Sequence, residues 1–160
     1  MTIKVGDKLP NVTITIATAE GPRPMSTDEF FKGKKVALFA LPGAFTPTCS
    51  AKHLPGFKQH SQDFKAKGVD VIACLSVNDA FVMRAWGEDQ AVGEDIVMIA
   101  DGGADFTKAV GLDFDASKFG MGLRSQRYSM IVDDGVVKEL NIEAPGEFKV
   151  SSAEYLLEQV

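Results

Sequence analysis

Three mainly apolar segments limit what this chain can fold into. They span Val36 to Leu41, Val69 to Val77 and Ile96 to Ala100. A segment with the periodicity of a helix lies between each of them and the next. Apolar runs of this length are typical of strands buried on both faces, as in a parallel sheet covered by helices. The alternation of such strands with helices predicts an α/β fold.

The segments between these runs have helical periodicity. The first places four residues on one helical face: Leu54, Phe57, Ser61 and Phe64. Pro55-Gly56 should bend or interrupt that helix. The second has a possible cap at Asn78 and four residues at helical spacing: Phe81, Val82, Ala85 and Trp86. A shorter helix is expected around Phe106 to Val110.

The N-terminal part should add a strand and a helix. Residues 12–18 alternate Thr with Val or Ile, which predicts a strand, and Pro22-Arg23-Pro24 predicts a turn after it. Ser26 and Glu29 have the spacing of a capping box, so a short helix should follow and end at Gly33.

The C-terminal part should add a hairpin and a last helix. Tyr128 to Val132 and Val136 to Ile142 flank Asp133-Asp134-Gly135, and Asp-Gly is a strong hairpin signal. Ser151 and Glu154 form a second capping box ahead of the last helix. The whole pattern predicts a thioredoxin-like fold, with a mixed central sheet flanked by helices. At 160 residues, we expect one domain over residues 1–160.

Composition and charge exclude several classes of function. The net charge of −5 leaves no basic stripe for phosphates, so nucleic acid is not an expected partner. No run approaches the ~20 apolar residues of a membrane span, and residues 1–10 lack a secretory signal. Two cysteines fit a reducing compartment. We expect a cytoplasmic protein, or an organellar one if a transit peptide was removed.

The informative segment is Pro42-Gly43-Ala44-Phe45-Thr46-Pro47-Thr48-Cys49-Ser50, just past the end of the first buried strand. Thr46 suits a helix N-cap and Pro47 the first helical position, which puts Cys49 in the first turn. Helix N–H groups and the helix dipole favour a thiolate there. Cys49 is therefore a candidate nucleophile, and the alternative is a small core residue.

Other reactive side chains have weaker interpretations. Cys49 and His53, four residues apart, could mimic a cysteine-histidine pair, so acyl transfer is an alternative, although hydrolases usually bring these groups from distant segments. The histidines and cysteines lack a zinc spacing, and Asp101 with Asp105 is interpreted as a solvated turn, so we expect no metal site. Cys74, inside a predicted central strand, is interpreted as a buried apolar residue.

Two arginines precede the predicted hairpin. Arg124 and Arg127 could each be surface charge, or could direct a guanidinium at Cys49. The residues alone do not choose between them.

The segment around Cys49 resembles the peroxidatic motif of the type II, or peroxiredoxin-5-like, peroxiredoxins of the thioredoxin-like AhpC/TSA superfamily. The similarity covers nearly the whole chain, through four further segments and Trp86: His53-Leu54-Pro55-Gly56-Phe57, Ser76-Val77-Asn78-Asp79-Ala80-Phe81-Val82, Arg127-Tyr128-Ser129-Met130 and Asp134-Gly135. It implies a thiol peroxidase that reduces hydrogen peroxide and alkyl hydroperoxides through a sulfenic acid, with no metal or organic cofactor.

The resemblance also implies roles for site residues. Cys49 would be the nucleophile, Thr46 would position the peroxide, Pro42 would shield the site from water, and Arg127 would activate the sulfur, whereas Arg124 has no matching role. Phe119 could line the substrate pocket, with an orientation that the sequence leaves open.

The resemblance leaves regeneration open. Many animal relatives resolve the sulfenic acid with a cysteine just before the last helix, but residues 147–152 contain none. Cys74 has the spacing of the plant type II pair, yet a mid-strand thiol would need local unfolding. We therefore expect an external thiol, glutathione with glutaredoxin first and thioredoxin second. We also expect a homodimer, for which Phe45, Phe81 and Trp86 could supply apolar surface.

Two rival hypotheses keep the same fold. A peroxide sensor or redox holdase would use Cys49 with slow turnover. A thioredoxin-like scaffold without chemistry would leave Cys49 unreactive toward peroxide.

Overall fold

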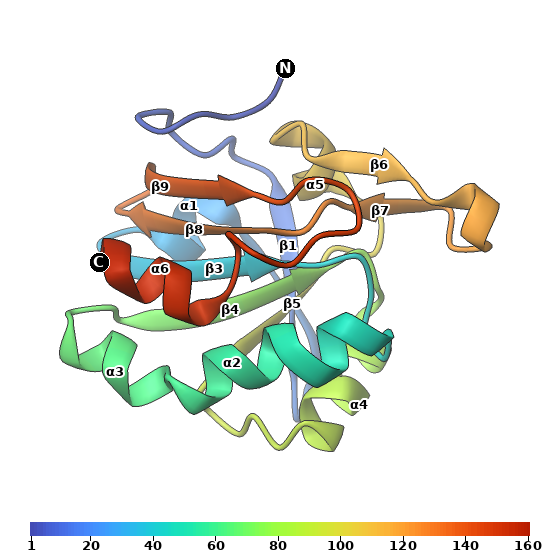
Figure 1. The fold of residues 1–160 in the computed structure, drawn as a ribbon, viewed down its shortest axis with the longest axis horizontal. Helices are drawn as coiled ribbons and strands as arrows, with labels where there is room; N and C mark the ends of the chain where they lie inside the picture. The colour runs from blue at the N-terminus through green and yellow to red at the C-terminus, as the bar shows by residue number, and fades with distance from the viewer.

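A seven-stranded sheet organises the chain in the computed structural model, which describes residues 1–160 (Figure 1). Its strands lie in the order β2-β1-β5-β4-β3-β8-β9. Their bounds are β1 (Thr13–Thr18), β2 (Gly21–Ser26), β3 (Lys35–Ala40), β4 (Val71–Ser76), β5 (Val97–Ala100), β8 (Tyr128–Asp133) and β9 (Val136–Ile142). A separate two-stranded sheet contains β6 (Asp113–Asp115) and β7 (Leu123–Ser125).

The three apolar runs form the centre of this sheet. Strands β3, β4 and β5 are parallel, with Cys74 of β4 between Phe39 of β3 and Met98 of β5. Strands β1 and β8 pair antiparallel to β5 and β3. The sheet is therefore mixed, and the predicted thioredoxin-like α/β class is confirmed.

Helices cover both faces of the sheet (Figure 1). Their bounds are α1 (Thr27–Phe31), α2 (Leu54–Gln59), α3 (Ser61–Ala66), α4 (Ala80–Asp89), α5 (Asp105–Ala109) and α6 (Ala153–Gln159), with a π-helical turn η1 (Cys49–His53) and a 3-10 turn η2 (Ser117–Phe119). Helices α2, α3, α4 and α6 bury apolar side chains in one core with Phe39 and Cys74. Helices α1 and α5 pack on the other core with Leu38 and Leu75. Burying strands on both faces explains why their runs are continuously apolar.

The segment with two prolines corrects one prediction. Pro22-Arg23-Pro24 lies within β2 and not in a turn, and Pro22 and Pro24 pair with Ala17 and Thr15 of β1. Strand β2 is at the edge of the sheet, where a residue without an N–H is tolerated. The turn comes earlier, at Ala19-Glu20.

Of the bend or interruption predicted at Pro55-Gly56, the interruption does not occur. Helical structure runs from Pro47 to Gln59, with η1 inside it, and breaks only at His60. The N–H of Leu54 bonds to the carbonyl of Cys49 through the π turn, and Pro55, which has no N–H to donate, follows directly after that turn. The predicted inward face is confirmed, because all four of its residues are buried: Leu54, Phe57, Ser61 and Phe64.

The inward face of α4 differs from the predicted one. The buried residues of α4 are Ala80, Met83, Trp86 and Gly87, whereas Phe81 is 73% exposed. The N-cap is Asp79, whose carboxylate accepts from the N–H of Val82. Asn78 has another role, described below.

One of the two predicted helix caps is confirmed and the other is displaced by one residue. Ser26 caps α1 as predicted, by accepting from the N–H of Glu29. Helix α6 is capped by Ser152 and not by Ser151, since the Ser152 side chain accepts from the N–H of Tyr155. The predicted hairpin is confirmed, with Asp134 and Gly135 both at positive φ, as its two-residue turn requires.

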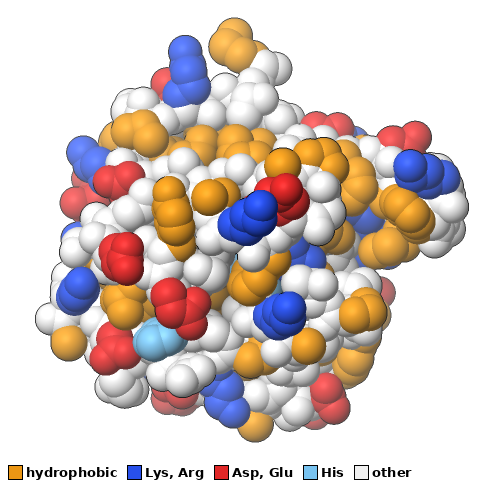
Figure 2. Space-filling view, viewed as in Figure 1, with side chains coloured by type: hydrophobic (Ala, Val, Ile, Leu, Met, Phe, Trp, Pro, Cys, Tyr) orange, Lys and Arg blue, Asp and Glu red, His pale blue; other side chains and the backbone are white.

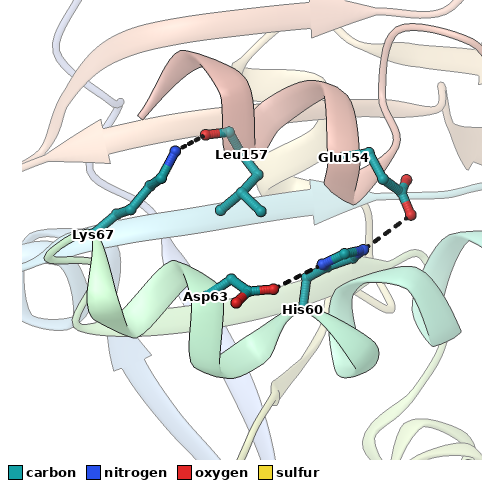
Figure 3. Close-up of polar contacts among 5 residues, drawn as sticks. All are labelled: His60, Asp63, Lys67, Glu154 and Leu157. Carbon is teal, nitrogen blue, oxygen red and sulfur yellow. Dashed lines mark hydrogen bonds and ion pairs between the residues drawn. The ribbon is translucent and has the colours of Figure 1, made fainter.

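Polar contacts tie α6 to the neighbouring helices (Figure 3). His60, between α2 and α3, contacts Asp63 at 2.9 Å and Glu154 of α6 at 3.2 Å. The bond to Asp63 is the first cause that raises the pKa of His60. At the other end of α3, Nζ of Lys67 donates to the carbonyl of Leu157 at 3.0 Å.

Charged side chains of both signs are mixed on the face of the molecule drawn in Figure 2. Figure 2 shows lysine and arginine side chains scattered among acidic ones on the face drawn, with no basic stripe there. None of the helices has the length and apolar character needed to cross a membrane.

Candidate active site

Cys49 lies at the carboxyl end of the parallel strands. The chain leaves β3 at Ala40, turns through residues 41–46 and becomes helical at Pro47, as predicted. The carbonyl of Thr46 accepts from the N–H of Ser50 at 3.0 Å, so the helix begins around the sulfur. Cys49 is fully buried in the core cluster shared by the sheet and the helices.

Arg127 makes the polar contact to this sulfur. Its Nη2 lies 3.1 Å from Sγ of Cys49, from a residue 78 positions away in sequence. Arg127 immediately precedes β8, and the first β8 residue, Tyr128, pairs with Ala40 at the end of β3. A guanidinium that donates to sulfur favours the thiolate over the neutral thiol.

His53 holds the other side of the guanidinium. Nη1 of Arg127 donates to Nδ1 of His53 at 2.9 Å, so Nε2 carries the histidine proton and donates to the carbonyl of Ser151 at 2.9 Å. Burial, with the charge of Arg127, lowers the pKa of His53 to about 3. The ring is therefore neutral at physiological pH, and both of its nitrogens are occupied. This argues against the acyl-transfer alternative, which needs His53 as the base for Cys49.

Phe148 covers the same arginine. Its ring centroid lies 5.9 Å from Cζ of Arg127 and 5.1 Å from the ring of His53. A guanidinium over an aromatic face is held by cation–π attraction. The loop that contains Phe148 is fixed by Glu143, whose carboxylate accepts from three consecutive backbone N–H groups, at Lys149, Val150 and Ser151.

Arg124 supports the loop and not the sulfur. Its Nη1 donates to the carbonyl of Pro42 at 3.1 Å, and its Nε donates to the carbonyl of Met121 at 2.9 Å. A Cβ at Gly43 would lie 2.9 Å from the same Nη1, so this approach leaves little room for a side chain. The structure thus gives different contacts to Arg127 and Arg124, which the sequence alone does not distinguish.

Other contacts fix the turn between β3 and the helix. The hydroxyl of Thr46 donates to the carbonyl of Gly43 at 2.6 Å, and so it closes the turn instead of accepting from the helix as an N-cap side chain would. The side-chain oxygen of Asn78 accepts from the N–H of Ala44 at 3.0 Å and from the hydroxyl of Ser76 at 2.6 Å. Asn78, predicted as a helix cap, instead anchors the loop.

Cys74 and Phe119 have contrasting surroundings. Cys74 is fully buried in the middle of β4, where burial raises its thiol pKa and the nearby Cys49 adds to the effect. Phe119 lies on η2, is 68% exposed and has the Nζ of Lys118 5.1 Å from its ring centroid. It is not part of the core cluster that contains Cys49.

Asp101 is not the solvated turn that the sequence suggests. It is 4% exposed and accepts from the N–H of Phe106 and from the N–H and hydroxyl of Thr107, which fixes the start of α5. Nowhere do three His, Cys, Asp or Glu side chains gather in a group that could hold a metal ion.

The site contains residues that sequence reasoning missed. Glu143 and Ser151 received no site role, and His53 was weighed as a base for Cys49 and as a zinc ligand but not as a partner of Arg127. Glu143 donates its N–H to the carbonyl of Arg127, and Ser151 reaches Arg127 only through His53, so both depend on the path of a loop 16 to 24 residues after Arg127. The only available signal was weak: a Glu followed by a short Gly-containing loop before the last helix.

Comparisons with known proteins extend these observations. Residues 4–157 match the Redoxin family. The chain is 52% identical to "Peroxiredoxin-2E-2, chloroplastic" of Oryza sativa subsp. japonica, over 98% of this chain and 72% of that protein.

Two solved structures share the whole fold. Reduced Prx3 from Vibrio vulnificus in complex with H2O2 superposes with a TM-score of 0.95 at 57% identity, over 99% of both chains. Peroxiredoxin 5 from Alvinella pompejana has a TM-score of 0.84 at 34% identity, over 98% of this chain and 96% of that one. This chain therefore belongs to the Redoxin family and, within it, to the type II peroxiredoxins, the thiol peroxidases whose cysteine motif its own residues 42–50 resemble.

Proposed function

We propose that Cys49 is the peroxidatic nucleophile of this enzyme and that it reduces hydrogen peroxide and alkyl hydroperoxides. The observation that carries the proposal is the 3.1 Å contact between Nη2 of Arg127 and Sγ of Cys49, in the first turns of a helix. Both the guanidinium and the helix N-terminus favour a thiolate, which is the nucleophilic form.

The reaction transfers one oxygen atom. The thiolate of Cys49 attacks the nearer peroxide oxygen, an S–O bond forms and the O–O bond breaks. The departing oxygen leaves as hydroxide or alkoxide, takes up a proton and becomes water or an alcohol. Cys49 is left as a sulfenic acid, oxidised by two electrons.

Three neighbours have proposed roles in this step. Arg127 would stabilise charge on both the sulfur and the departing oxygen, because its planar group carries several donors. Thr46 would position the peroxide, with its hydroxyl held at the site by Gly43. Pro42, whose carbonyl is held by Arg124, would shield the sulfur from water. Phe119 stays a candidate for the outer wall of the substrate pocket.

An external thiol would regenerate Cys49. Attack of that thiol on the sulfenic acid forms a mixed disulfide and water, and a second thiol then releases Cys49. We propose glutathione with glutaredoxin as the reductant, with thioredoxin as the alternative. The burial of Cys74 in a central strand supports an external donor, because reaching Cys49 from there requires local unfolding.

We further propose that the whole chain acts as one domain in a cytoplasmic homodimer. Phe45 is 54% exposed and Phe81 is also exposed, which supports an apolar contact near the active-site loop. Trp86 is fully buried, so it would not contribute. The rice relative is named chloroplastic, which keeps an organelle as the alternative location.

Intact mass after one equivalent of hydrogen peroxide tests the proposal. The wild type should gain one oxygen on Cys49, and Cys49→Ser should gain none and should not consume peroxide with a thiol donor. A fully active Cys49→Ser protein would overturn it. Turnover separates the enzyme from a sensor, since a sensor would oxidise once and recycle slowly.

A further inference from the structure

The carboxylate of Glu143 occupies an unusual position just past the end of β9. Its Oε2 accepts four hydrogen bonds of 2.7 to 2.9 Å, three from the N–H groups of Lys149, Val150 and Ser151 and one from the Ser151 hydroxyl. Burial alone would raise the pKa of Glu143, but these hydrogen bonds lower it. The group is therefore a stable anion that gathers one loop around itself.

That loop supplies two contacts to the guanidinium system. The loop leaves β9, doubles back past the ends of the neighbouring strands and enters α6 (Figure 1). Ser151 offers its carbonyl to Nε2 of His53 at 2.9 Å, and Phe148 places its ring over Cζ of Arg127. The backbone also joins the two segments, since the N–H of Glu143 donates to the carbonyl of Arg127 at 3.0 Å.

A continuous chain of contacts follows. Glu143 fixes Ser151, Ser151 fixes the tautomer and ring plane of His53, and Nδ1 of His53 accepts from Nη1 of Arg127. Nη2 of Arg127 then contacts Cys49. A guanidinium loses specificity when its plane is free to rotate, so the orientation of each link affects the sulfur.

We infer that Glu143 is a positioning residue for peroxide reduction, which acts on Cys49 through Ser151, His53 and Arg127 without touching the substrate. The inference rests on the proposed function of Cys49, and it assigns the reactivity of that sulfur partly to a carboxylate on the far side of the histidine.

Glu143→Gln is the direct test, because it keeps the shape of the side chain and removes its charge. Two rates are measured: oxidation of Cys49 by hydrogen peroxide in single turnover, and alkylation of Cys49 by iodoacetamide across pH 4 to 9, in a Cys74→Ala background so that one thiol remains. We expect peroxide oxidation to slow by about 2- to 30-fold, the range of energetic coupling through contact networks. The midpoint of the alkylation profile should move to higher pH.

Ser152→Ala is the matched control. It removes the neighbouring cap of α6, the bond to the N–H of Tyr155, and leaves every contact of Glu143 in place. It should loosen the start of α6 without moving the alkylation midpoint. If Ser152→Ala moves the midpoint as far as Glu143→Gln does, general loosening of the loop explains both and the inference is wrong.

A double-mutant cycle with His53→Ala tests the path. If Glu143 acts through His53, Glu143→Gln should have little further effect once His53 is gone. Equal losses in both backgrounds would overturn the inference. Ser151→Ala, which removes one of the four hydrogen bonds, should give a smaller shift in the same direction and replaces Glu143→Gln if that variant does not fold.

The two failures are distinguishable. A wild type that does not consume hydrogen peroxide, with an alkylation profile still shifted by Glu143→Gln, would refute the proposed function but keep the coupling of Glu143 to Cys49. A wild type that consumes peroxide and a folded Glu143→Gln with unchanged rate and profile would do the reverse.

Discussion

Nε1 of Trp86 lies 3.0 Å from Oγ of Ser50, the residue after Cys49, and donates a hydrogen bond to it. Trp86 is the single tryptophan of the chain and is fully buried in α4. The bond therefore ties α4 to the helical turn that contains Cys49, and it places a fluorescent side chain beside that turn.

Ser50→Ala should destabilise the protein by about 1–3 kcal/mol, because it leaves the buried indole N–H without a partner. The emission maximum of Trp86 should shift in the same variant. Urea unfolding followed by fluorescence and by circular dichroism measures both. Ser117→Ala, on the exposed η2, is the control, and equal stability of the two variants would contradict the prediction.

Arg127→Lys should slow peroxide oxidation of Cys49 despite keeping the positive charge. One ammonium cannot reproduce the separate contacts of Nη1 to His53 and Nη2 to Cys49. A hydrogen bond to a charged group contributes about 1.5–3 kcal/mol, which corresponds to ~10- to ~100-fold in rate. Stopped-flow kinetics measures the loss. Arg124→Lys should lose less, since Arg124 donates to backbone carbonyls only, and the opposite order would refute these assignments.

Stability should fall as the pH drops from 7.5 to 5. Unfolded His53 takes up a proton near its ordinary pKa of 6.5, whereas the native ring stays neutral until about 3. The stability that this neutral ring contributes is full above pH 6.5 and declines below it, by up to about 1.4 kcal/mol per pH unit. Urea unfolding at several pH values gives the slope.

The matched variant for this slope is His53→Gln, which should flatten it. His60 has the opposite sign, because its raised pKa adds stability at low pH that is lost as the pH rises. The comparison is therefore best made in a His60→Gln background. A slope that survives His53→Gln there would show that another group is responsible.

Cys74→Ala should keep most of the peroxidase activity with a glutathione or thioredoxin system. The expected change is a loss of about 1 kcal/mol in stability, since a buried side chain is shortened in a central strand. Activity assays and non-reducing mass spectrometry measure the two effects. A collapse of turnover, together with a wild-type disulfide between Cys49 and Cys74, would refute the external-thiol proposal.

The sequence predicts the central strands because their apolar runs are dictated by burial on both faces. It also predicts the hairpin at Asp134-Gly135 and the helix that begins at Pro47, where local chemistry decides the structure. Strand β2 was missed because two prolines mark a turn more often than an edge strand. The sequence left Phe81 open between the core and an exposed apolar surface, because apolar character alone does not distinguish the two.

The site likewise contains residues that local sequence identifies and residues that only the tertiary structure identifies. Cys49 stands out from its neighbours along the chain, whereas Arg127 was separated from Arg124 only by a family resemblance. The difference between these arginines is tertiary. Arg127 immediately precedes β8, which pairs with β3, whereas Arg124 lies in β7 of the small sheet. The part played by Glu143 depends on a loop conformation that no local pattern encodes.

The π turn at Cys49 sets how the residues before it are rotated about the helix axis relative to the residues after it. Its bond from Leu54 to the Cys49 carbonyl spans five residues, one more than an α-helical bond spans. Before this extra residue, the helix is held to the loop by the hydrogen bond from Ser50 to Thr46. After it, Phe57 packs the helix into the core. Deleting exposed Ala51 would remove the offset and rotate Cys49 by about 100° relative to Phe57, away from Arg127. The presence of a residue at position 51 is thus required even though its exposed side chain has no role in the chemistry, because the number of residues in the turn sets the direction of Cys49.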